Sequence, residues 1–302
     1  MSESTNYPIN RRQFLLHSVL SGLLLASPGL ARAAQPLTAL AIVERIKQAC
    51  AAQGITWAEQ TADTFKLGEP NTPVTGVIST FSATIDVMQR AVKQGANFII
   101  SHEPIFYNHF DDTTELAARK DPVYLSKVRF AKANNLVVWR FHDHFHRLKP
   151  EPVTTALYQR LGWDQLPSEG QGFSRSFTHP PITLKQLAEL FAKQFPSGSV
   201  RYVGDPDQQV ANVSLTSHSI GGVISAFKVS DAGVSAEVRE WDSVEYTRDA
   251  TELGMDKGLV LIAHERGEQY GMKHIVPWLS SVINELPVTF IDSHEPFRTL
   301  KV

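Results

Sequence analysis

Three strand-like runs of this 302-residue chain end in histidine, with carboxylates close by. FIIS runs into His102 and Glu103, VVWRF runs into HDHFH (residues 142–146), and VLIA runs into His264, which Glu268 follows four residues later. Five of the eleven histidines lie at these run ends. Neutral imidazole nitrogens and carboxylate oxygens suit divalent transition metals, so these positions are candidate metal ligands.

Spacing within two of the runs adds a geometric argument. In a helical turn, His264 and Glu268 lie on one face, where they can meet one ion or bridge two. In extended backbone, His142, His144 and His146 share one face. Each run could therefore present several ligands to the same place.

The donor types limit the choice of metal. The chain has one cysteine, Cys50, so a site built from several thiolates is excluded, and Zn, Fe, Mn, Ni or Co is favoured, with one or two ions per chain. Cys50 lies in the helical pattern AIVERIKQACAAQG, which favours a buried structural thiol. A histidine-rich surface strand that merely scavenges metal is the alternative that these residues leave open.

Alternating helices and strands must position these ligands. This βαβ rhythm is typical of an α/β sheet with parallel central strands, and such sheets bind ligands outside the carboxyl ends of their strands. The histidines fall at those ends. The pattern predicts helices over residues 37–53, 85–94 and 122–134, and strands over 72–80, 97–101 and 136–142.

A second block of elements follows residues 150–181, a stretch with many prolines, glycines and serines that is the best candidate for an internal boundary. We expect the fold class to be α/β, with two interleaved halves, mixed, largely parallel sheets and the metal site at the carboxyl ends of strands. The elements expected in this block are helices over 183–195 and 271–286 and strands at VSAEVREW, LVLIAH and VTFIDS.

Residues 1–34 are typical of a twin-arginine export signal, which leaves 35–302 as the metal-binding α/β unit. Arg11 and Arg12 precede an uncharged run over 14–26, and small residues around Ala33 stand where a signal peptidase needs them. The run is shorter than the roughly 20 residues that span a bilayer. We expect cleavage after Ala33, a periplasmic or secreted protein, and no integral membrane segment after cleavage.

The charge balance gives no indication of a nucleic-acid partner. The whole chain has a formal net charge of −2, and loss of the signal would leave about −4. Because the twin-arginine route carries folded proteins, any metal would be loaded before export. The expected partner is a small-molecule substrate.

The order of these motifs resembles the dinuclear metal-centre hexameric protein family, also described as NGG-interacting-factor-like. That order is an apolar strand followed by His-x-Pro, a strand ending in a histidine loop, and a distant strand ending in His-x-x-x-Glu. The similarity covers about 36–302 and includes GVISTFSATIDVMQRAVKQGANFIISHEPIFY, ALYQRLGW and LVLIAHERGE. Some members are named type 2 GTP cyclohydrolase I. The resemblance implies a metal centre and a ring-like homohexamer.

Two of the family's motifs, the first and the last along the chain, can be matched to residues of this sequence. The family's His-His-Pro falls on His102, Glu103 and Pro104, so glutamate stands where the family has its second histidine. The later His-x-x-x-Glu falls on His264 and Glu268. The resemblance therefore implies four ligands from these two motifs.

The family's middle motif, His-x-x-x-Asp, falls on His142 and His146, so histidine replaces the aspartate that would bridge two metals. A carboxylate can bridge two cations, whereas a neutral imidazole offers one lone pair to one metal. Glu103 or Glu268 could take over the bridge. A mononuclear site is the competing outcome.

Metal-activated hydrolysis is the function that follows from this site. One or two such ions lower the pKa of bound water and polarise a leaving group, which serves hydrolysis of esters, amides, amidines or phosphoesters. The candidates for acid/base duty are His144, Asp143 and Glu265. A non-catalytic periplasmic metal-binding or accessory protein is the alternative. GTP is disfavoured, because no Walker-type loop is visible and an exported protein would rarely meet GTP.

The SHEP turn recurs near the C-terminus as SHEPF, residues 293–297. The motifs implied by the resemblance are already filled without it. We therefore predict that His294 and Glu295 cap the sheet edge or line the rim of the pocket instead of binding metal.

Overall fold

The computed structural model describes residues 36–196, 200–216 and 221–300, and the predicted export signal lies outside this part. Leu37–Val302 groups as one unit by its internal contacts. The boundary expected within 150–181 stays a prediction. Over the described residues, no helix is both long enough and apolar enough for a membrane crossing.

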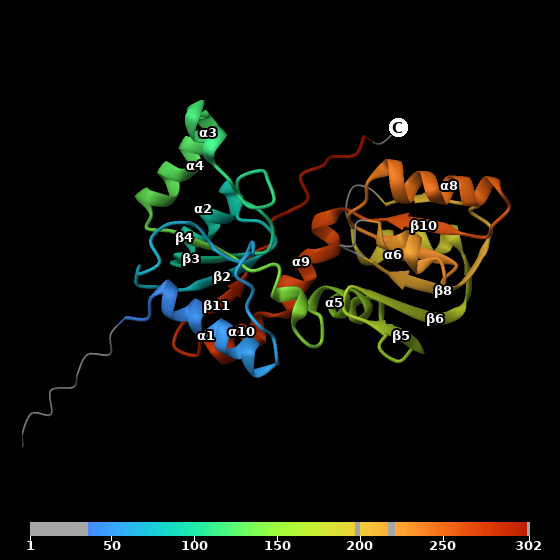
Figure 1. Cartoon of the computed structure of the whole chain (residues 1–302), viewed down its shortest axis with the longest axis horizontal. Coiled ribbons are helices and arrows are strands. Elements are labelled where there is room, and N and C mark those ends of the chain that lie inside the picture. Colours follow the sequence, from blue (N-terminus) through green and yellow to red (C-terminus); the bar gives the residue numbers. More distant parts are fainter. Residues whose placement is uncertain (1–35, 197–199, 217–220, 301–302) are drawn as a thin grey trace, which may run out of the picture. The chain divides into compact units, whose positions relative to one another are not determined.

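Two β-sheets, each packed against helices, organise the described residues (Figure 1). The strands are β1 (Phe65–Leu67), β2 (Val77–Thr80), β3 (Phe98–Ser101), β4 (Val137–Arg140), β5 (Ser168–Gln171), β6 (Ser174–Thr183), β7 (Arg201–Val203), β8 (Gln209–Leu215), β9 (Ala232–Ser235), β10 (Gly258–Leu261) and β11 (Val288–Phe290). The α-helices are α1 (Ala39–Ala52), α2 (Ile85–Lys93), α3 (Thr114–Ala118), α4 (Pro122–Ala133), α5 (Pro152–Leu161), α6 (Leu184–Gln194), α7 (Gly222–Ala226), α8 (Glu245–Glu252), α9 (His264–His274) and α10 (Val276–Val282). A 3₁₀ turn, η1 (Phe145–Arg147), and a π-helical turn, η2 (Glu240–Val244), complete the set.

The first sheet has the order β1-β4-β3-β2-β11, and only the β1–β4 pairing is antiparallel. Alternate residues of its central strands enter two different cores. Val77 and Phe98 pack in the cluster that contains α1, whereas Ile78 and Ile99 pack in the cluster that contains α2. Because helices cover both faces, β2 and β3 are buried at every position, without the alternation of buried and exposed residues that marks a half-exposed strand.

The second sheet has the order β5-β6-β8-β9-β10-β7, parallel at β8-β9-β10 and antiparallel elsewhere. Leu187 and Phe191 of α6 share a core cluster with Val213 and Val260 of the sheet. The β5–β6 hairpin lies in the stretch where the sequence indicated only turn-forming residues. Its strand β5 is largely exposed at the sheet edge, so it lacks the apolar pattern that marks a strand.

The two sheets are interleaved along the chain. After the second sheet is complete, β11 returns to the first and pairs in parallel with β2, Val288 opposite Val77. The predicted α/β class, with mixed sheets and interleaved halves, is confirmed. The helix predicted over 271–286 is present but divided and shorter: α9 ends at His274, and α10 runs from Val276 to Val282 with Pro277, which lacks an amide donor, at its start.

Candidate metal centre

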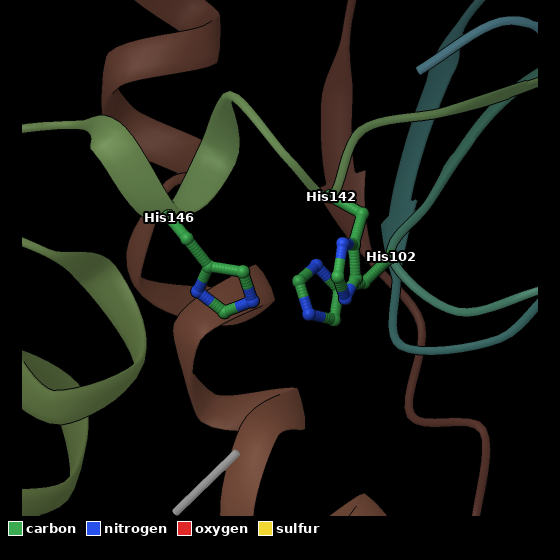
Figure 2. Close-up of side chains that lie close together, drawn as sticks. All are labelled: His102, His142 and His146. Carbon is green, nitrogen blue, oxygen red and sulfur yellow. The ribbon is translucent and has the colours of Figure 1, made fainter. Parts of the chain in front are cut away.

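Three histidines meet at the carboxyl ends of β3 and β4. His102 directly follows β3, and His142 follows its parallel neighbour β4. One turn later His146 joins them, because its backbone N–H donates to the His142 carbonyl at 3.2 Å. The ring centroids are 4.7 Å apart for His102 and His142, 4.8 Å for His102 and His146, and 5.0 Å for His142 and His146. Figure 2 shows the His146 ring approaching the other two from its turn.

The other nitrogen of each ring fixes its tautomer. All three Nδ1 atoms face oxygens that can only accept, so each neutral imidazole carries its proton on Nδ1 and its lone pair on Nε2. The acceptors are the Phe141 carbonyl for His102 at 3.2 Å, Asp143 Oδ1 for His142 at 2.9 Å, and Glu151 Oε1 for His146 at 2.9 Å. This is the arrangement expected of histidines that bind a metal through Nε2.

Glu268 lies between histidines that come from the two sheets. His264 begins α9 just after β10, and Glu268 is one helical turn further on. Glu268 Oε1 is 3.1 Å from His264 Nε2, and Oε2 is 3.2 Å from His102 Nε2. Each oxygen of this buried carboxylate therefore faces a different imidazole.

Glu103 flanks the histidines from the first sheet. Its Oε1 lies 3.6 Å from His142 Nε2 and 3.9 Å from His102 Nε2. The buried guanidinium of Arg140 lies behind it, with Nη2 4.0 Å from Glu103 Oε2 and Nε donating to the His102 carbonyl at 2.9 Å. Arg140 therefore places a positive charge next to the glutamate that departs from the family motif.

Glu237 is a carboxylate that the sequence analysis missed. VSAEVREW was predicted to be a strand throughout, but β9 ends at Ser235, which leaves Glu237 beyond the carboxyl end of that strand. There it groups with His264 and Glu268, their ligand atoms all within 4.8 Å of one another. The histidines were recognised because they follow the carboxyl ends of strands. With the end of β9 placed at Ser235, the same criterion selects Glu237.

These residues form three overlapping groups that could hold metal ions. Within each group the ligand atoms lie within 4.8 Å of one another. The groups are His102–His142–His146, His102–Glu103–Glu268, and Glu237–His264–Glu268. The structure thus brings together all six predicted metal ligands, and adds Glu237.

The buried polar atoms at the centre fit a cation. His102 Nε2, His264 Nε2 and both oxygens of Glu268 are buried without a well-aligned hydrogen bond, although the distances between them are short. Lone pairs that face one another at such distances repel unless a proton or a metal ion lies between them. The donor set of imidazoles and carboxylates suits a divalent transition metal.

The charges at the centre agree with this. Burial opposes a charged imidazole at His264, but nearby carboxylates, Glu268 foremost, raise its pKa to about 10. Burial likewise opposes charge on His102, and the contact with Glu268 raises the pKa of that ring. The two histidines in turn hold the pKa of Glu268 well below its usual range, although burial opposes this. Glu268 is therefore an anion, and its negative charge favours a cation, either a proton or a metal ion, next to both His102 and His264.

His144 is held apart from these groups, and the expectation that it shares a face with His142 and His146 was wrong. The backbone turns into η1 instead of staying extended. His144 Nδ1 bonds to Asp63 Oδ2 at 2.7 Å, and Nε2 accepts from the Ala58 N–H at 2.9 Å. Both ring nitrogens are thus occupied, which leaves His144 no free nitrogen for proton transfer in this structure.

Asp143 contacts the centre through another residue. It accepts from His142 Nδ1, from Thr61 Oγ1 at 2.7 Å and from the Ala62 N–H at 2.8 Å. Its hydrogen bond with His142 is the main reason that its pKa lies well below the usual range. A carboxylate so stabilised is a weak base, and the geometry indicates that it orients the His142 ring.

Glu265 lies next to His264 on α9, and its pKa is shifted upward, in the opposite direction to that of Asp143. Burial is the main cause that raises its pKa to about 8, and the nearby carboxylates Asp292 and Glu295 add to the shift. Glu265 is therefore mainly protonated at neutral pH. The SHEPF turn thus lies close to the predicted acid/base residue, while neither His294 nor Glu295 belongs to a metal-ligand group found among the described residues.

Asp63 was not anticipated from the sequence. Its Oδ1 accepts from the backbone N–H groups of His142 and Asp143 at 2.6 and 2.9 Å, and Oδ2 accepts from the His144 N–H at 2.9 Å. This one side chain fixes the turn that presents the histidines. It lies in a loop some 80 residues earlier, and no local pattern links the two segments.

The fold and the cluster define an α/β protein with a potential metal centre at the carboxyl ends of its strands. The chain belongs to the Duf34/NIF3 (NGG1p interacting factor 3) family, whose model matches residues 35–296. The resemblance predicted from the sequence is confirmed.

Solved structures and named relatives agree with this membership. Staphylococcus aureus protein SA1388 has a TM-score of 0.68 at 18% identity, covering 88% of this chain and 100% of that one. A Bacillus cereus protein related to NIF3 has a TM-score of 0.68 at 15% identity, covering 87% and 99%. Relatives named GTP cyclohydrolase 1 type 2 homolog occur in Clostridium acetobutylicum (23% identity over 198 residues, 63% of this chain and 71% of the relative) and Streptomyces coelicolor (23% over 217 residues, 65% and 73%).

Proposed function

We propose that this protein is a metal-dependent hydrolase with two transition-metal ions at the cluster. The observation that carries the proposal is the position of Glu268, whose two oxygens face His102 and His264 at 3.2 and 3.1 Å. A buried carboxylate that faces two imidazoles in this way is suited to bridge two cations. Glu268 would then hold both ions, the role that the resemblance gave to an aspartate at the position of His146.

The remaining ligands divide between the two ions. His102, His142 and His146 would hold one, through Nε2 atoms whose orientation is set by their Nδ1 partners. His264 and Glu237 would hold the other together with Glu268. His146 is then a terminal ligand, a role for which the single lone pair of an imidazole is sufficient.

Zn, Fe, Mn, Ni or Co fits this donor set, and a bound ion would supply activation of water and polarisation of the leaving group. Glu265 is the candidate proton donor, because burial keeps it mainly protonated at neutral pH. Asp143 would orient the His142 ring, and Asp63 would hold the backbone of the turn at residues 142–146 in place. Arg140 would hold Glu103 against the ligands.

We further propose that the protein is exported by the twin-arginine route and acts as a homohexamer on a small molecule. The first rests on Arg11, Arg12 and the cleavage pattern around Ala33, and the second on family membership. The name of the two relatives refers to GTP, but an exported protein would rarely meet GTP, so a different substrate is favoured. Fractionation of cells and light scattering of the purified protein test the location and the assembly.

Metal analysis followed by a hydrolysis screen tests the main proposal. The purified protein should hold about two equivalents of a transition metal and hydrolyse a model ester or phosphoester, and His264→Ala should lose about one equivalent of metal and most of the hydrolysis. His274→Ala is the matched control, because His274 is exposed on the same helix. Less than half an equivalent of metal after reconstitution would overturn the metal site. Full metal content without hydrolysis would indicate a binding or accessory protein.

A further inference from the structure

A cavity of about 650 Å³ opens beside the metal cluster. It lies between the segment from η1 to α5 and the β5–β6 hairpin, and His146 is part of its wall. The same imidazole belongs to the three-histidine group. The volume is in the range that small-molecule sites occupy, so a ligand in this cavity would lie against the metal centre.

Three cationic residues line this cavity: Arg147, whose guanidinium also donates to the Thr56 carbonyl at 3.5 Å, Lys149 and Arg175. Within the described part of the chain, none of them forms an ion pair with a carboxylate. The one acidic residue in the wall is Glu151. Its oxygens accept from His146 Nδ1 at 2.9 Å and from the N–H groups that begin α5, so its charge is engaged in the wall itself.

Arg175 is held in place, which distinguishes it from a loose surface cation. Its guanidinium donates to Ser168 Oγ through Nε and Nη2 at 3.1 and 2.8 Å. It also lies over the Tyr158 ring, 5.0 Å from the ring centre. No carboxylate among the described residues forms an ion pair with it, which points to a binding function for the cavity.

We propose that this basic cavity binds the anionic part of the substrate, a small molecule that carries at least two negative charges, such as a phosphate ester. Three cations around one cavity match a multiply charged group better than a single carboxylate, which one cation would balance. The inference rests on the proposed hydrolase function, since it places the bond to be hydrolysed at His146 and the metal centre.

Binding of inorganic phosphate to chelator-treated, metal-free protein tests the cavity without any turnover. Equilibrium dialysis should show phosphate binding that weakens about tenfold in Lys149→Met and again in the Arg147→Met, Lys149→Met double variant. Lys132→Met, which removes an exposed lysine on α4, should bind like the wild type. Absence of binding, or equal loss in Lys132→Met, would overturn the proposal. A parallel titration with citrate distinguishes a phosphate ligand from a polycarboxylate ligand. Tighter binding of citrate than of phosphate would assign the cavity to polycarboxylates.

Steady-state kinetics of the metal-loaded protein separate this inference from the hydrolase proposal. For p-nitrophenyl phosphate, Lys149→Met should raise KM about tenfold with little change in kcat, while the neutral p-nitrophenyl acetate should show no change. Equal effects on both esters would refute a role in anion recognition. If no ester is hydrolysed but phosphate still binds to the metal-free protein, the hydrolase proposal fails and the anion site stands.

Discussion

Glu237 decides, at the scale of single residues, whether the cluster can hold a second ion. It is the third member of the group with His264 and Glu268. A glutamine keeps the shape but loses the negative charge and offers a weaker ligand, so we expect Glu237→Gln to lower the metal content by about one ion per chain. Inductively coupled plasma mass spectrometry measures this. The exposed Glu240, three residues on, provides the control Glu240→Gln, and an unchanged metal content in Glu237→Gln would contradict the assignment.

Lys127 gives the protein a specific pH dependence. It is buried, and its Nζ donates to the Ile105 carbonyl in the loop after β3 at 2.9 Å. Burial lowers its pKa from 10.5 to about 8, against a smaller opposing effect of Asp111. Between these values the unfolded chain binds more protons than the folded one, so the free energy of unfolding should rise with pH, by on the order of 3 kcal/mol.

Comparison with Lys127→Met isolates this effect from other titrating groups. The difference in unfolding free energy between wild type and Lys127→Met, measured by urea denaturation, should change by that amount from pH 8 to 10.5. Lys132→Met, on the same helix but exposed, should give a flat difference. A flat difference for Lys127→Met as well would mean that Lys127 titrates normally.

The candidate ligands were largely predictable, whereas the residues that orient them were not. His102, His142 and His264 directly follow apolar strands, and strand ends can be recognised from local sequence. Asp63 and Glu151 act through contacts with distant or turning backbone, which local patterns do not specify. The expectation that His144 shares a face with His142 and His146 failed for the same reason, because the sequence could not distinguish an extended run from a 3₁₀ turn.

At the scale of elements, Gly271 lets α9 approach α5 closely. A Cβ at Gly271 would lie 3.0 Å from Val153 Cα and 3.1 Å from its backbone nitrogen, at the start of α5. Gly271→Ala should therefore force α9 and α5 apart and lower the unfolding free energy by about 2 kcal/mol, although alanine favours helix by about 1 kcal/mol. Urea denaturation measures this. Lys273→Ala, at an exposed position of α9, should change stability by less than about 0.5 kcal/mol, and an equally mild Gly271→Ala would show that the helices can adjust.

Elements with a strong apolar pattern were predicted, and those at edges or breaks were not. β3, β4 and β10 are buried throughout and were recognised as short apolar runs. The β5–β6 hairpin escaped notice because exposed edge strands carry few apolar residues. The break between α9 and α10 depends on Pro277, whose effect was outweighed in the sequence by apolar spacing on both sides of it.

At the scale of the whole molecule, the candidate metal centre joins segments that are far apart in the chain. His102 and His142 follow strands of the first sheet, whereas Glu237 and His264 follow strands of the second. Glu268 connects the two sets through its contacts with His102 and His264. Ions bound here would act as cross-links between the two sheets, so metal binding and folding stability should be coupled.

Removal of metal should therefore destabilise the whole described unit and not only the loops around the site. A ligand present at a thousandfold excess over its Kd stabilises the folded state by about 4 kcal/mol. For a chain of this size that corresponds to a fall in Tm of about 10 °C after treatment with a chelator. Scanning calorimetry with and without chelator measures the shift. The same comparison on Glu268→Gln should show a much smaller shift, because that variant lacks the carboxylate that faces both sets of ligands. If wild type and variant respond alike to the chelator, the stabilising metal is bound elsewhere.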